Sequence, residues 1–181
     1  MRQKAVCIPD IIREVAQRTS TEVLPELQAQ RDWIEQVNFE VGTAAEITEM
    51  LALKSQQPTL EPKRFPLIAL FVPIIESRGR QFDIYGVENV RIVIAVNTPP
   101  GIRTPERLED NFKPILYPIY LEFMNQLYLD KRTIARTSGD FEHTKTDWPY
   151  YDTEEKANAF GTYIDAIEIR NLQLNINLKH C

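Results

Sequence analysis

The segment from Arg107 to Leu129 constrains the fold of this 181-residue chain more than any other. Its apolar side chains recur at three- and four-residue steps and therefore share one helical face. They are Leu108, Phe112, Ile115, Leu116, Ile119, Tyr120, Phe123 and Leu127. Pro114 and Pro118 lie inside this pattern, and each lacks the N–H group that an α-helix needs. We therefore predict a break near Lys113, with a short helix before it and the main core helix after it.

The N-terminal part predicts a first helix followed by a less regular segment. Residues 9–18 begin with a proline and an acid and carry a short apolar face, which is typical of a helix. Residues 22–31 are polar with scattered apolar positions, and Pro25 interrupts them. We interpret this second stretch as a loop or a further helical turn.

A strand and a second helix follow. Residues 34–41 alternate between apolar and polar positions, which predicts a half-buried strand that Gly42 ends. Thr43 and Glu46 then match the capping box, in which each side chain bonds the backbone N–H of the other residue. This motif predicts a helix that continues to about Ser55.

Two apolar stretches predict an antiparallel hairpin. Residues 65–75 form the most apolar run, and Pro73 disfavours a helix there, so we predict a strand buried on both faces. Residues 87–97 alternate as a second strand. The charged residues 76–86 between them are interpreted as a long hairpin loop.

The last strand is expected over residues 163–178. Its apolar residues occupy odd positions up to Ile169 and even positions from Leu172 onward. A regular strand cannot keep both sets on one face, so we predict a bulge near Arg170 and Asn171.

Residues 130–162 are polar, dotted with aromatic side chains and poor in aliphatic ones. We interpret them as a projecting loop or hairpin arm. The sequence as a whole predicts one α+β domain over residues 1–181, with an antiparallel sheet of about four strands packed by two or three helices.

Composition narrows the classes of function. The net charge of −5 disfavours a nonspecific DNA-binding surface. No apolar run approaches the roughly 18 residues of a membrane helix, and no secretory signal is expected. Cys7 and Cys181 are too few for a disulfide framework or a cysteine-based zinc site, and we expect free thiols.

Candidate catalytic groups are sparse. A metal site could be assembled around His143 and Asp147, with nearby acids or the second histidine, namely Glu142, Asp152, Glu154, Glu155 and His180. Acids in a loop without fixed spacing rarely form such a site. The sequence around Ser138–Asp140 is not a nucleophile elbow.

Carboxylate pairs and aromatic residues give equally weak indications of a nuclease or a nucleobase-binding function. A metal-dependent nuclease could use Asp83 with Glu88, or Asp165 with Glu168, but the second pair should face opposite sides of a strand. The aromatic residues Trp148, Tyr150 and Tyr151 could stack on bases, although such a cluster is more often an interface or a small loop core. We predict no catalytic, cofactor-binding or metal-binding residue.

Five stretches in this order resemble one protein family. They are VNFEVGTAAEI (37–47), KRFPLIALFVPI (63–74), VENVRIVIAVNT (87–98), ERLEDNFKPILYPIYLEF (106–123) and YIDAIEIRNLQLNI (163–176). Their arrangement is similar to that of the tail-terminator and tail-completion proteins of tailed bacteriophages, over about residues 8–178.

The resemblance implies a structural virion protein without catalytic residues. Such subunits form rings, commonly hexamers, that cap the tail tube and join it to the head connector. The expected partners are further copies of this chain, the tail tube and the neck proteins, and DNA would pass through the lumen without specific binding. The expected location is the virion, assembled in the cytoplasm of the bacterial host.

In this interpretation residues 76–86 and 130–162 carry the contacts between subunits and with the tail tube. Deletion of residues 138–152 is then expected to leave a folded monomer that cannot assemble. Two alternatives remain: a small metal-dependent hydrolase that uses His143 and Asp147, and a monomeric adaptor that binds one partner.

Overall fold

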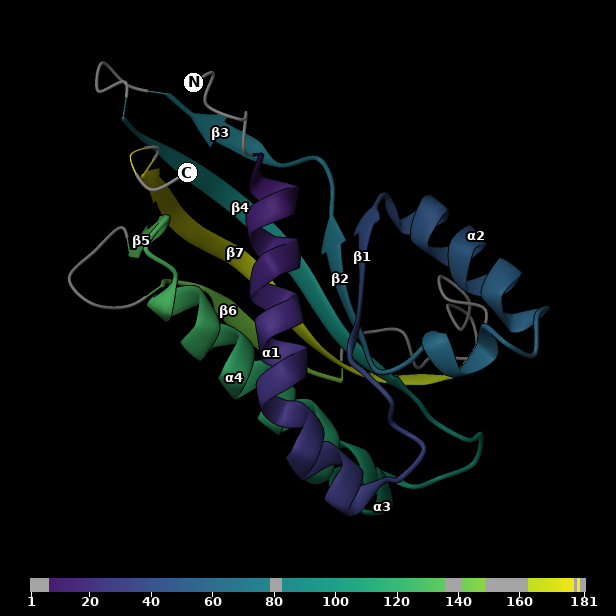
Figure 1. Ribbon diagram of the computed structural model, residues 1–181. Coiled ribbons are helices and arrows are strands. Elements are labelled where there is room, and N and C mark those ends of the chain that lie inside the picture. Colours follow the sequence, from purple (N-terminus) through teal and green to yellow (C-terminus); the bar gives the residue numbers. More distant parts are fainter. Residues whose placement is uncertain (1–6, 79–82, 136–140, 149–162, 178, 180–181) are drawn as a thin grey trace.

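The computed structural model describes residues 7–78, 83–135, 141–148, 163–177 and 179, which form a seven-stranded mixed sheet with helices on both faces (Figure 1). Two long antiparallel strands, β4 (Ile84–Asn97) and β7 (Ile164–Asn177), form its centre. The short strands β2 (Leu67–Phe71) and β3 (Ile75–Ser77) pair with β4. Two more, β5 (Thr133–Ala135) and β6 (Thr144–Asp147), pair with β7.

The general α+β class is confirmed, but the predicted antiparallel sheet of four strands is wrong. Strand β1 (Asn38–Gly42) lies at the edge of the sheet and runs parallel to β2. Helix α2 (Ala44–Ser55) and the 3₁₀ turn η1 (Glu61–Lys63) lie between these strands in sequence and return the chain to the end where β1 began. This crossover allows β1 and β2 to run parallel, whereas a short hairpin turn would make them antiparallel.

The predicted hairpin of β2 and β4 is confirmed, and β2 is buried on both faces. The segment 76–86 is not entirely the long hairpin loop that we predicted, because β3 extends the pairing with β4. Residues 79–82 of this segment lie outside the described residues.

The predicted bulge near Asn171 is confirmed, and a second bulge lies opposite on β4. The pairing shifts on both sides of Val90, which lies opposite Leu172. Each bulge contains an asparagine with positive φ, 54° at Asn171 and 55° at Asn89. Asparagine tolerates this left-handed conformation better than most residues.

Both bulges keep apolar side chains on the face that the helices cover. On β4 these side chains change from odd to even positions, as they do on β7, and all pack into the same core cluster. They are Tyr85, Val87, Val90, Ile92, Ile94 and Val96 on β4, and Ile167, Ile169, Leu172, Leu174 and Ile176 on β7.

Helix α1 (Ile8–Gln30) covers this face beside α4 (Tyr117–Leu129) (Figure 1). The prediction of a loop over residues 22–31 is wrong, because α1 continues through Pro25. Val23 and Leu27 extend the buried stripe of the first turns at four-residue steps. Their burial outweighs the local cost of about 3 kcal/mol for a proline in a helix.

The predicted break near Lys113 is also wrong. A helical turn, α3 (Thr104–Arg107), continues into a π-helical segment, η2 (Leu108–Leu116), and then into α4. The N–H of Tyr117 bonds to the carbonyl of Phe112, five residues earlier. This wider turn accommodates Pro114, which can neither donate an α-helical bond nor fit closely against the preceding turn.

The opposite face of the sheet carries a smaller core under α2. Thr43 and Glu46 form the predicted capping box, and the helix ends at Ser55 as expected. Ile47 and Leu51 pack against residues of β2, β4 and β7. No described helix is both long and apolar enough to cross a membrane.

An ionic cluster joins α1 to the turn after α4. Asp130 accepts hydrogen bonds from Arg18 Nη2 at 2.6 Å and from the backbone N and Nε of Arg132, each at 2.9 Å. Burial alone raises the pKa of Asp130, but the bonds from Arg132 and Arg18 outweigh it and hold this pKa well below its usual range. The cluster therefore holds the two long helices together most strongly when Asp130 is ionised.

The bulge on β7 predicts a specific response to substitution. Asn171→Ala should lower the free energy of unfolding by about 1 kcal/mol, because alanine is strained at positive φ. Asn171→Gly should leave it unchanged within about 0.5 kcal/mol, because glycine adopts this conformation freely. Urea unfolding of the three proteins measures both effects, and equal stability of the alanine and glycine variants would contradict the assigned conformation.

The Asp130 cluster predicts a pH-dependent loss of stability. Asp130→Asn should lower the free energy of unfolding by about 2 kcal/mol at pH 7, because charge-assisted bonds to two arginines are weakened. The pKa of Asp130 is lower in the folded state, so its contribution is present above about pH 5 and decreases as the pH falls below about 4. Unfolding curves of the variant and the wild type should converge as the pH is lowered from about 4 to about 2, and a constant difference would contradict the assignment.

Candidate functional site

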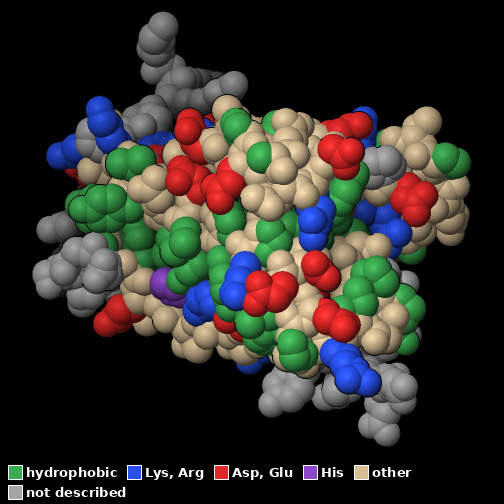
Figure 2. Space-filling model, turned by 90° about the horizontal axis from the view of Figure 1, so that it is seen from below, with side chains coloured by type: hydrophobic (Ala, Val, Ile, Leu, Met, Phe, Trp, Pro, Cys, Tyr) green, Lys and Arg blue, Asp and Glu red, His purple; other side chains and the backbone are tan. Residues whose placement is uncertain are grey.

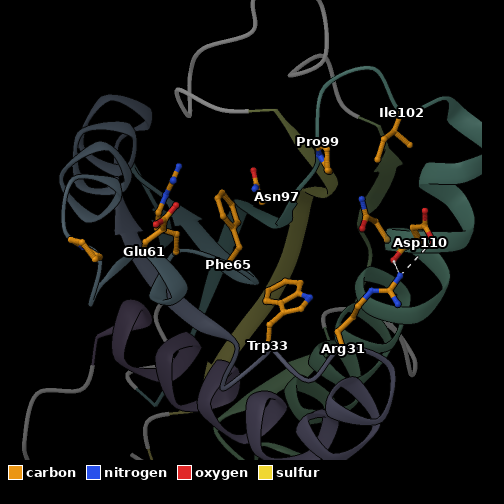
Figure 3. A pocket seen from close by; sticks show the side chains of 11 residues that line it. Arg31, Trp33, Glu61, Phe65, Asn97, Pro99, Ile102 and Asp110 are labelled. Carbon is orange, nitrogen blue, oxygen red and sulfur yellow. Dashed lines mark hydrogen bonds and ion pairs between the residues drawn. The ribbon is translucent and has the colours of Figure 1, made fainter.

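A pocket of about 620 Å³ opens at the end of the sheet where β2 begins and β4 ends (Figure 3). This volume falls within the range of small-ligand pockets and of cavities that take a partner's side chains. Its apolar wall combines residues from the loop after α1, the loop before β2 and the loop after β4. They are Trp33, Pro58, Phe65, Pro99 and Ile102.

A buried hydrogen-bond network fixes the back wall of the pocket. The carboxylate of Asp165, at the start of β7, accepts bonds from Thr98 Oγ1 and Asn111 Nδ2, each at 2.6 Å. Arg107 Nε donates to the same carboxylate at 2.5 Å. All four side chains are buried. Because Asn111 also lines the pocket, its position is set before any ligand enters.

Arg31 and Asp110 form one side of the rim. Arg31 Nη2 lies 3.5 Å from the carboxylate of Asp110 and donates to the backbone carbonyl of the same residue at 3.2 Å. Figure 3 shows Arg31 reaching across to Asp110 beside Trp33. The charge of Arg31 is therefore already balanced within the subunit.

Arg64 differs from Arg31 because one of its donors is unused. Its Nε is buried and has no hydrogen-bond partner among the described residues. Its guanidinium carbon lies 5.5 Å from the centre of the Phe65 ring. Burial lowers the pKa of Arg64 and the nearby Glu61 partly opposes this, while the side chain stays protonated.

Comparison with protein-family models and with curated proteins finds no match to this chain.

The candidate metal ligands His143 and Asp147 lie beside α4 rather than at the pocket. Tyr120 Oη lies 2.9 Å from His143 Nε2, and His143 Nδ1 lies 2.7 Å from the carbonyl of Phe141. A carbonyl can only accept, so Nδ1 carries a proton. Asp147 accepts a bond from Tyr117 Oη at 3.0 Å.

Hydrogen bonds within the same chain therefore hold both candidate metal ligands in place. Burial raises the pKa of Tyr117 and Tyr120, and Asp147 raises both further, so these hydroxyls stay protonated. Among the described residues, no three His, Cys, Asp or Glu side chains gather closely enough to hold a metal ion. His180, Asp152, Glu154 and Glu155 lie outside the described residues.

The carboxylate pairs are also separated. Asp165 and Glu168 lie on opposite faces of β7, as their spacing predicts. Glu168 accepts a bond from Arg91 Nε at 2.5 Å, so both acids are buried against arginines. Asp83 forms an exposed ion pair with Lys179 at 3.2 Å.

Trp148 belongs to the protein core rather than to a nucleobase platform. Its ring centre lies 3.9 Å from that of Phe112, and the rings are tilted by 37°. This position agrees with the interpretation as a small loop core. Tyr150, Tyr151 and residues 138–140 lie outside the described residues.

The interpretation of residues 130–162 as a projecting arm is wrong for their described parts. β5 and β6 complete the sheet, and Phe141 is buried in the main core. Deletion of residues 138–152 would remove β6 and Trp148, so it should damage the fold instead of leaving an intact monomer. Residues 136–140 and 149–162 lie outside the described part of the chain.

Sequence reasoning missed the pocket because its residues come from separate loops. One signal was available, since Arg31 and Trp33, like Arg64 and Phe65, place a cation and an aromatic ring close together outside regular elements. Only the crossover from β1 to β2 brings these two loops to one opening.

The buried network predicts the most destabilising polar substitution near the pocket. Asp165→Asn should lower the free energy of unfolding by about 3–5 kcal/mol, because it removes the charge of a buried carboxylate that faces the buried Arg107. Asp110→Asn is the matched control, since Asp110 is exposed, and it should change stability by less than about 1 kcal/mol. Chemical denaturation measures both variants, and equal effects would contradict the role of the network.

Proposed function

We propose that this protein is a structural subunit of the head–tail joint of a tailed bacteriophage. In this proposal it assembles into a ring, most simply a hexamer, that terminates the tail tube and connects it to the neck. The support is the family resemblance of five sequence stretches, together with two exposed apolar surfaces on opposite flanks of the sheet. The second observation comes from the structure alone and carries the proposal.

The first surface lies on α4, and we call it the α4 surface. Leu121, Tyr128 and Leu129 are 64%, 62% and 60% exposed. Ile134 of the neighbouring strand β5 is also exposed. Figure 2 shows hydrophobic side chains gathered at the left, on the side where α4 and β5 lie in Figure 1. Exposed apolar groups of this size that lie together mark a site of protein contact.

The second surface is the apolar wall of the pocket, whose Trp33 lies in the loop before β1, at the opposite end of the strand order from β5. Trp33 is 46% exposed. A head-to-tail ring joins two different surfaces of neighbouring subunits, whereas a twofold dimer needs only one self-complementary surface. Two separated apolar surfaces on one subunit therefore favour a ring.

The remaining features of the proposal are compatible with the charge and the fold. The net charge of −5 suits a lumen that DNA crosses without specific binding. The tail tube and the neck proteins are the proposed partners on the two sides of the ring. The proposed location is the virion, after assembly in the cytoplasm of the bacterial host.

The two alternatives differ in what they require. A metal-dependent hydrolase needs its ligands free, but Tyr120 and Tyr117 hold His143 and Asp147. A monomeric adaptor needs one contact surface, and it gives no reason for a second one on the opposite flank.

Light scattering after size-exclusion chromatography tests the proposal over a series of protein concentrations, with and without EDTA. We expect a ring-sized mass, six times the 21.0-kDa subunit for a hexamer, that EDTA does not change. Electron microscopy should then show rings. Leu121→Glu should reduce this mass by placing a charge in the contact, while Gln17→Glu, on the exposed side of α1, should not.

Other outcomes would contradict the ring. A monomer at every concentration would favour the adaptor. A mass that falls when EDTA is added would favour the metal-dependent alternative.

A further inference from the structure

A second pocket, of about 500 Å³, lies along the open edge of the sheet beside β1. Its first wall is α1, which contributes Arg13 and Gln17, and its second wall consists of Lys54 of α2 and Lys63 of η1. Figure 1 shows β1 at this border of the sheet, with α1 on one side and α2 on the other. We call this pocket the edge groove.

The backbone of β1 pairs with β2 on one side and faces the edge groove on the other. Phe39 and Glu40 point to opposite faces of the sheet, yet both line the groove, so the groove spans the edge of the strand. The N–H of Asn38 donates to the carbonyl of Pro66 at 2.8 Å, which sets the even-numbered residues of β1 against β2. The N–H and C=O groups of Phe39 and Val41 therefore point away from β2. They have no hydrogen-bond partner within the described part of the chain.

These open backbone groups make β1 different from the other strands that pair on one side only. Ser20 Oγ accepts a bond from the N–H of Val37 at 2.9 Å, so α1 already satisfies the outward donor just before β1. The two outward residues that follow are open. β1 has five residues, whereas β3, β5 and β6 have three or four. An unpaired edge of this kind is a template for a further strand.

The charges of the edge groove select the side chains of such a strand. Lys54 Nζ donates to Glu40 Oε1 at 2.7 Å, and Arg13 pairs with Asp10 at 2.7 Å, so these charges are balanced within the chain. Lys63 is exposed and forms no ion pair with the described residues. A carboxylate on the added strand would balance its charge.

The two faces of the sheet require different side chains on that strand. Glu40, Lys54 and Lys63 place charge on the side that α2 covers. On the other side Phe39 packs against the main core, and the guanidinium carbon of Arg13 lies 5.8 Å from the centre of its ring. A strand that alternates acids with apolar residues matches both sides, with its acids toward Lys63 and its apolar side chains beside Phe39.

We propose that the edge groove binds an extended acidic segment of a different protein, which joins the sheet as a further strand beside β1. The main chain of this segment bonds to Phe39 and Val41, and one of its acids pairs with Lys63. Main-chain bonds of this kind supply affinity, and the alternating side chains supply specificity. The inference goes beyond the proposed ring and does not depend on it.

A second copy of this chain fits the groove less well than a different protein does. The described strands with an open edge are β1, β3, β5 and β6, and β5 contains no acid. The acids of the other three are Glu40, Glu76 and Asp147, and each is already ion-paired within the chain. None of them is free to balance Lys63.

Fluorescence anisotropy with a labelled peptide tests the proposal on the full chain. The probe has about eight residues that alternate between valine and glutamate, and it should bind saturably. A peptide of the same composition with its valines and glutamates grouped in pairs should bind at least about tenfold more weakly, because it cannot keep its acids on one face. Lys63→Glu should weaken binding of the alternating peptide about tenfold. Lys113→Glu, at an exposed lysine of η2, is the matched control and should leave binding unchanged.

Amide hydrogen exchange, followed by NMR, tests the main-chain bonds. The amides of Phe39 and Val41 should exchange fast in the free protein and slowly with the peptide bound, while that of Asn38 is protected in both states. Methylation of the peptide nitrogens provides a second test, because only one edge of the added strand faces β1. Methyl groups on either all valines or all glutamates should abolish binding, and those on the other set should not.

Each contrary result overturns the proposal in a recognisable way. Absence of saturable binding, or equal affinity for the alternating and the paired peptide, would show that the groove accepts no such strand. Protection of Phe39 and Val41 that rises with protein concentration alone would identify a second copy as the occupant. Light scattering decides separately whether rings form, so peptide binding without rings would contradict the proposed function and support this inference.

Discussion

The pairing of β4 with β7 is the constraint on which the rest of the structure depends. Each strand is 14 residues long, and each would turn half of its apolar side chains away from the helices if it ran without a bulge. The bulges at Asn89 and Asn171 correct this on neighbouring strands, on either side of the pair Val90 and Leu172. The result is one continuous apolar face on which α1, η2 and α4 pack.

Structural features that depend on patterns over many residues could be predicted from the sequence. The change of parity between Ile169 and Leu172 predicted a bulge, and the capping box at Thr43 predicted α2. The strands β3, β5 and β6 have three or four residues each, which is too short for a period to be recognised. Pro25 and Pro114 predicted that the helices would be interrupted at these residues. The helices remain continuous there because the apolar stripes on both sides of each proline pack against the core.

The candidate site was less predictable than the fold, because it depends on tertiary structure. The sequence places Arg31, Arg64 and Asn111 far apart, and nothing local indicates that they line one pocket. Asp165 appeared only as half of a weak carboxylate pair, yet its main role is to anchor the wall of this pocket through Arg107. His143 and Asp147 were candidate metal ligands from the sequence, but both are hydrogen-bonded to tyrosines of α4.

The position of β7 in the chain has a consequence for biosynthesis. This central strand is the last of the described strands to leave the ribosome, more than 65 residues after β4. Until it emerges, β4 has one unpaired edge, and the apolar face under α1 and α4 is incomplete. Sequence-distant pairing of this kind folds slowly and leaves strand edges open to other chains. Newly made chains should therefore be most prone to aggregation, and most dependent on chaperones, before residues 164–177 have been added.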